Sequence, residues 1–129
     1  MSEILVPVAP GELLDKITIL RIKAERITDP AKLANVRHEL ALLEETWRRA
    51  VPPGVVLQAE ERELTRVNQA LWEVEDAIRE KEAAQQFDAE FIALARSVYR
   101  RNDERAALKR QVNTKLGSSL IEEKSYSEY

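Results

Sequence analysis

The side chains in this sequence that are most suited to chemistry form two runs of opposite charge. Basic residues gather late in the chain as Arg96, Arg100, Arg101, Arg105, Lys109, Arg110 and Lys115. Acidic residues gather earlier as Glu60, Glu61, Glu63, Glu73, Glu75, Asp76, Glu80 and Glu82. The basic run could bind RNA phosphates, but we favour a helical hairpin in which the two runs neutralise each other. The expected pairs are Glu73 with Arg100 or Arg101 and Glu63 with Lys109 or Arg110.

A second group of polar and aromatic side chains falls near the middle of the same hairpin. It consists of Trp72, Glu75, Arg79, Arg96, Tyr99, Arg100 and Asn102. One interpretation is a polar pocket for a small anionic ligand, in the general style of the small all-helical chorismate mutases, whose arginines grip carboxylates. The other interpretation, which we favour, is a polar layer that fixes how the two helices align.

Other catalytic or metal-binding patterns are missing from the sequence. The chain has no cysteine and a single histidine, His38, which stands between Arg37 and Glu39 on a charged stretch. A thiol nucleophile, a disulfide framework and a Cys-ligated metal are therefore excluded. The sequence also lacks a Glu-x-x-His pair for a di-metal bundle site and a Gly-rich phosphate loop. We accordingly predict no catalytic residue, metal or cofactor.

The composition is typical of one helical domain. The 129 residues include only 3 glycines, and 33% of them are charged. The net charge of −3 argues against a dedicated nucleic-acid-binding protein, which is usually strongly basic. No apolar run approaches the roughly 18 residues of a membrane span, and the first residues do not resemble a signal peptide. We expect a cytoplasmic location.

The stretch "ITI" near the N-terminus reads locally like a strand, but its surroundings predict a helix over 11–27. Apolar residues step by four and three positions, as Leu13, Ile17, Leu20, Ala24 and Ile27. Only a helix brings these side chains to one face. Burying one Ile or Leu stabilises by about 1.5–3 kcal/mol, whereas a β-branched residue costs a helix only a few tenths of a kcal/mol.

Turn residues divide the rest of the chain. Asp29 is a suitable N-cap for a helix over 31–50, and "VPPGV" at 51–55 interrupts the chain. A third helix over 56–84 carries apolar residues every seven positions, as in a coiled coil. After a turn at 85–88, a fourth helix over 88–116 begins at Asp88 and ends before Gly117. We therefore predict a single all-α domain over 1–129, in which 11–27 pairs with 31–50 and 56–84 pairs with 88–116. An extended lead, 1–10, precedes this antiparallel bundle, and a tail, 117–129, follows it.

The first helix has a second apolar face. Ile19 and Ile22 lie away from its main stripe and are flanked by Asp15 and Arg26. Such a face needs a cover. If the long hairpin does not provide it, this face is the first candidate surface for a partner.

The tail also offers two alternatives. Ser119 and Glu122 have capping-box spacing, which is compatible with a short helical turn. An ordered tail would dock Glu122, Glu123, Lys124 and Tyr126 on the bundle. The alternative is a mobile tail, as is common at the end of a domain.

Segments at both ends of the chain resemble a family of small bacterial all-helical proteins of unknown function. The most specific are "GELLDKITILRIKAERI" and "GSSLIEEKSY", and the similarity extends over nearly the whole chain. The resemblance implies a helical fold and no known activity. Our leading hypothesis is a non-enzymatic interaction or scaffold protein that forms homo-oligomers. A small enzyme or anion-binding bundle is second, and RNA binding is third.

Overall fold

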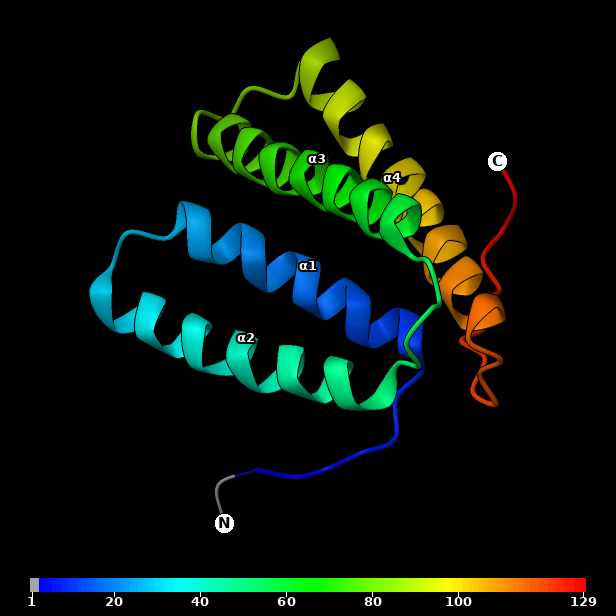
Figure 1. Ribbon diagram of the computed structural model, residues 1–129. Coiled ribbons are helices and arrows are strands. Elements are labelled where there is room, and N and C mark those ends of the chain that lie inside the picture. Colours follow the sequence, from blue (N-terminus) through cyan, green and yellow to red (C-terminus); the bar gives the residue numbers. More distant parts are fainter. Residues whose placement is uncertain (1–2) are drawn as a thin grey trace.

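The computed structural model describes residues 3–129, which form two helical hairpins (Figure 1). The helices are α1 (Pro10–Arg26), α2 (Pro30–Ala50), α3 (Gln58–Ala83) and α4 (Ala89–Lys115). Each bound lies within two residues of the sequence-based prediction, and residues 3–129 contain no strand. The all-α bundle is confirmed. None of these four helices is both long and apolar enough to cross a membrane.

Local chemistry explains where the helices begin and end. The Asp29 carboxylate accepts the Lys32 N–H at 2.9 Å, and the Asp88 carboxylate accepts the Phe91 N–H at 3.0 Å. These side chains satisfy backbone donors that a helix start leaves without partners. Gly117 ends α4 with a φ of 61°, a left-handed conformation that glycine adopts without steric cost.

Helix α1 is the centre of the molecule. It contacts each of the other three helices, whereas α2 makes its helix–helix contacts only with α1. Ile17 and Ile22 point to different sides of α1, and both are buried. The "ITI" segment is therefore helical because tertiary packing surrounds it.

The proposed partner surface on α1 is largely covered by the chain itself, which corrects that hypothesis. Asp15 is 0% exposed and Ile22 is 2% exposed. Ile19 is half-buried, and exposed Arg26 pairs with Glu73 of α3 at 3.3 Å. Since α3 and α4 both pack on this side of α1, no second subunit is needed to bury it.

The hydrophobic core lies at one end of the long hairpin. Leu14, Leu57, Leu64 and Val112 form its centre, and Trp47 packs against them. The buried residues of α3 all fall within its first eleven positions, and those of α4 within its last seven. The remainder of the hairpin, residues 69–83 and 89–108, has no buried residue. We call this part the distal hairpin.

The expected ion pairs across the long hairpin were wrong in detail. Glu73 pairs with α1 instead of α4, and Glu63 pairs with Arg66 on its own helix at 2.9 Å. Helix α1 packs beside α3 and draws Glu73 toward Arg26. The observed pairs that join the two arms of the hairpin are Arg66 with Glu104, Lys81 with Asp88 and Glu90, and Lys115 with Glu60.

Candidate functional site

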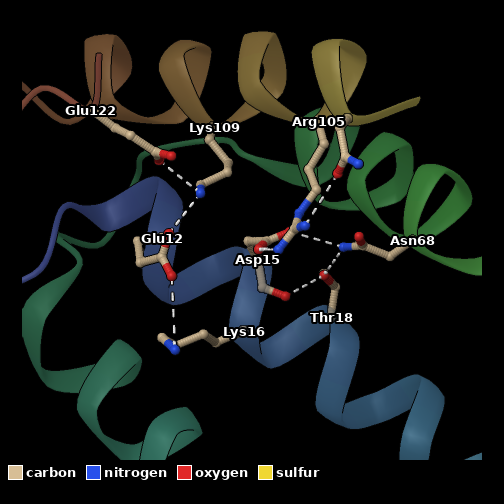
Figure 2. A network of polar contacts seen from close by, with 9 residues as sticks. Glu12, Asp15, Lys16, Thr18, Asn68, Arg105, Lys109 and Glu122 are labelled. Carbon is tan, nitrogen blue, oxygen red and sulfur yellow. Dashed lines mark hydrogen bonds and ion pairs between the residues drawn. The ribbon is translucent and has the colours of Figure 1, made fainter. Parts of the chain in front are cut away.

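A buried ion pair joins α1 to α4 at the centre of the bundle (Figure 2). Arg105 donates from Nε to Asp15 Oδ1 at 2.9 Å and from Nη2 to Asp15 Oδ2 at 2.5 Å. Two parallel hydrogen bonds of this kind fix both distance and orientation. The hydrogen bonds with Asp15 also raise the pKa of Arg105 despite its partial burial. The pair holds residues that are 90 positions apart in the sequence.

Three further side chains complete this network. Asn68 of α3 donates from Nδ2 to Asp15 Oδ1 at 2.9 Å and to Thr18 Oγ1 at 3.1 Å. The Thr18 hydroxyl donates to the main-chain carbonyl of Asp15 at 2.7 Å, and Arg105 Nη1 donates to Asn102 Oδ1 at 3.5 Å. Asp15 therefore has donors from two other helices. The arrangement is that of a structural clamp on α1, α3 and α4.

A second charged group lies one helical turn further along α4. Lys109 Nζ is 2.6 Å from Glu12 Oε2 and 2.7 Å from Glu122 Oε2 (Figure 2). Burial opposes the charge of this ammonium, but the hydrogen bonds to Glu12 and Glu122 outweigh burial and raise the pKa of Lys109. The buried basic groups of the centre thus already have acidic partners.

Four of the seven residues expected in a polar pocket do share one hollow. Trp72, Glu75, Arg79 and Asn102 line an open hollow of about 470 Å³, together with Ile19, Asn68, Leu71, Asp76 and Arg105. Arg79 pairs with Glu75 at 3.2 Å, and Arg105 pairs with Asp15. Both arginines of this hollow already have a carboxylate partner. The lining therefore has no free guanidinium that could bind an anion.

The other three residues expected in the pocket lie elsewhere. Tyr99 of α4 packs against the tail, where its ring lies 4.8 Å from that of Tyr129. The Arg96 and Arg100 side chains near the Tyr99 hydroxyl lower the pKa of this phenol. Arg96 and Arg100 are themselves exposed. Within residues 3–129, no group of three or more His, Cys, Asp or Glu side chains is arranged to hold a metal ion.

The tail runs back along α4 (Figure 1). Glu122 pairs with Lys109, and Glu123 lies 3.5 Å from Arg110. The contact with Lys109 lowers the pKa of Glu122, whereas the hydrogen bond from the Tyr129 hydroxyl to Asp103 raises the pKa of Tyr129. Docking of the tail is therefore favoured when Glu122 is ionised and Tyr129 is protonated.

The tail differs from the expectation in two respects. Residues 120–129 contain no helical turn, because the Glu122 side chain pairs with Lys109 instead of capping a helix. Tyr126 is 81% exposed and is not docked. Lys124, also a residue of the tail, lines two hollows between the tail and α4.

Comparison with known proteins gives a family but no activity. No curated protein and no solved structure significantly matches the chain. A family of unknown function, DUF6165, matches residues 4–129. Since this match covers nearly the whole chain, the protein belongs to the DUF6165 family.

Proposed function

We propose that the protein is a non-enzymatic interaction module that pairs with a second copy through its distal hairpin. The observation that carries this proposal is that no side chain of the distal hairpin is fully buried within the chain, although many of them are large and apolar; most of these are half-buried, and Ile92 is exposed. They include Leu71, Trp72, Val74, Ile78, Phe91, Ile92, Leu94 and Val98.

Two helices alone cannot bury such a surface. Each helix of a pair covers one stripe of its neighbour and leaves the flanks of that stripe in water. In Figure 1 the first half of α4 leans away from α1 and α2, which therefore do not cover it. Ile92 is 55% exposed and nearby Phe87 is 53% exposed. A second hairpin would complete a four-helix bundle, the usual way of burying such stripes.

Charge favours a second copy of this chain as the partner. Asp76, Glu80 and Glu82 of α3 are exposed, and no ion pair engages them within residues 3–129. The same is true of Arg96 and Arg100 of α4. The two arms of the distal hairpin thus have complementary charges. In a two-fold symmetric pair, α3 of each copy would face α4 of the other and place these acids opposite the two arginines.

The rival functions find less support. An anion-binding or enzymatic bundle needs a hollow with a basic side chain that has no carboxylate partner. In the hollow lined by Trp72 and Asn102, both arginines, Arg79 and Arg105, are paired with carboxylates. A surface that binds RNA needs exposed basic side chains along α4 that are free to contact phosphates. Of the seven in the basic run, only Arg96 and Arg100 have no carboxylate partner in the part of the chain that the structure describes.

Replacing Ile92 with glutamate should convert a dimer into a monomer. The charged side chain would enter the proposed apolar contact between copies, whereas its effect on each chain should stay within about 0.5 kcal/mol because the position is exposed. Sedimentation equilibrium measures the change in mass. Leu42→Glu on α2, at a position 45% exposed, is the matched control and should leave the dimer intact. A wild-type monomer, or a dimer that survives Ile92→Glu, would count against the proposal.

A further inference from the structure

We propose that the outer face of α4 is a docking groove for an extended acidic, tyrosine-bearing segment of a partner protein, and that the chain's own tail occupies this groove as a competitor. The groove runs along α4 from Tyr99 to Thr114, and the occupying tail is residues 120–129. The Tyr99 end of the groove adjoins Val98 and Arg100 of the proposed dimer contact. The inference nevertheless rests on contacts within one chain and does not depend on dimer formation.

One end of the groove recognises carboxylates. Lys109, whose side chain is only 10% exposed, holds Glu122 at 2.7 Å. Arg110 lies 3.5 Å from the Glu123 carboxylate and donates to the main-chain carbonyl of Glu122 at 3.4 Å. Lys109 and Arg110, which are adjacent in the sequence, thus contact two neighbouring carboxylates and one backbone carbonyl of the tail. A contact to the backbone requires an extended segment, since a helix would use that carbonyl itself.

The other end recognises a tyrosine. The Tyr129 hydroxyl donates to Asp103 Oδ2 at 2.6 Å, and its ring meets that of Tyr99 edge-on at an interplanar angle of 65°. An aromatic pair of this kind contributes about 0.5–1.5 kcal/mol beyond area burial. The groove thus contacts both the hydroxyl and the ring of Tyr129. A phenylalanine at this position would lose the hydrogen bond to Asp103.

The tail fills the groove loosely. From Glu122 to Tyr129 an extended chain reaches about 23 Å, whereas the stretch of α4 between Lys109 and the Asp103–Tyr99 end spans only about 9–15 Å. The excess length lets the tail bow outward, which leaves a hollow of about 640 Å³ lined by Tyr99, Asp103 and tail residues. A ligand with a shorter spacing between carboxylate and tyrosine would span the groove without this slack.

Two large side chains of the tail, Ile121 and Tyr126, line the hollows of the groove but stay largely exposed. Ile121 is 64% exposed and Tyr126 is 81% exposed, while a hollow of about 420 Å³ remains beside Ala106, Ala107 and Ile121. Its hold therefore rests mainly on surface ion pairs, each worth about 0–1 kcal/mol. What keeps the tail in place is its covalent attachment, which gives an effective concentration in the millimolar range. A partner segment that also filled this hollow would displace it.

A labelled peptide with the sequence of residues 118–129 tests the groove in the full-length protein. The wild-type chain should bind it weakly, because its own tail competes. The double variant E122Q/E123Q weakens the internal tail and should bind the same peptide about tenfold more tightly, as expected if roughly 1.4 kcal/mol of competition is removed. Fluorescence anisotropy gives both dissociation constants.

Two further variants locate the binding surface. In the E122Q/E123Q background, Arg110→Glu should abolish peptide binding, because it removes one carboxylate-binding base. Arg37→Glu is the matched control, since Arg37 is exposed on α2 and has no ion-pair partner within residues 3–129. Equal peptide affinity for the wild type and E122Q/E123Q, binding that survives Arg110→Glu, or no binding to any variant would overturn the proposal. A loss of dimer in E122Q/E123Q would identify the occupant as the tail of a second copy, and would also overturn it.

Discussion

Replacing Asp15 with alanine should lower the free energy of unfolding by about 3 kcal/mol, near the lower end of the range for a broken buried ion pair. Asp15 is 0% exposed and accepts hydrogen bonds from both Arg105 and Asn68. Without the carboxylate, the guanidinium and the amide lose their acceptor inside the bundle. The lower end of the range applies because the Arg105 side chain is 30% exposed and can recover part of its hydration. Urea denaturation followed by circular dichroism measures the loss.

Two comparisons separate the ion pair from its surroundings. Glu25→Ala, an exposed acid on the same helix without an ion-pair partner in residues 3–129, should change the stability by less than about 0.5 kcal/mol. The double variant D15A/R105M removes both charges and should be more stable than D15A alone, because no unpaired guanidinium remains. A cost below about 1 kcal/mol for Asp15→Ala would show that the pair does not hold the helices together.

Replacing Gly11 with alanine should destabilise the protein by about 1–3 kcal/mol, the usual cost of overpacking. A β-carbon at this position would lie 2.3 Å from the main-chain oxygen of Lys109 and 2.9 Å from Asn113 Oδ1. The first turn of α1 would have to move away from α4. It would then lose the 2.7 Å hydrogen bond that the Gly11 N–H donates to Asn113.

The sign of this effect is informative. Where space is free, Gly→Ala in a helix stabilises by up to about 1 kcal/mol, so a stabilising Gly11→Ala would contradict the close approach of α1 to α4. Ala31→Gly, at an exposed site in the first turn of α2, is the reverse control. It should cost less than about 1 kcal/mol through propensity alone. Thermal unfolding of both variants provides the measurement.

Helix positions were predictable because they depend on local chemistry. The apolar steps of 11–27 and the capping residues Asp29 and Asp88 act over a few residues. Leu13, Ile17 and Leu20 of this stripe are buried, and both aspartates cap their helices. Long-range pairing was not predictable in the same way. The charges of α3 and α4 alone predict pairs within their hairpin, whereas in the structure α1 engages Glu73 through Arg26.

The sequence indicates that α3 and α4 carry buried polar residues, but it does not show which residues pair in the network around Asp15. Asn102 and Arg105 interrupt the apolar stripe of the fourth helix, and Asn68 stands among apolar positions of the third. Polar residues at such positions indicate buried partners. The position of Asp15 in the sequence indicates the edge of an exposed face, and only the packing of α1 between α2 and the long hairpin brings Asp15 to Arg105.

The proposed pairing of two copies is tested most directly by exchanging charges between the arms of the distal hairpin. In R96E/R100E the four positions 76, 80, 96 and 100 are all acidic, and in D76R/E80R all four are basic. Each variant alone should be monomeric, because like charges would face each other across the symmetric contact. An equimolar mixture should restore a dimer in sedimentation equilibrium, since every acid then meets a base. A mixture that stays monomeric, or variants that dimerise as well alone as the wild type, would contradict the account.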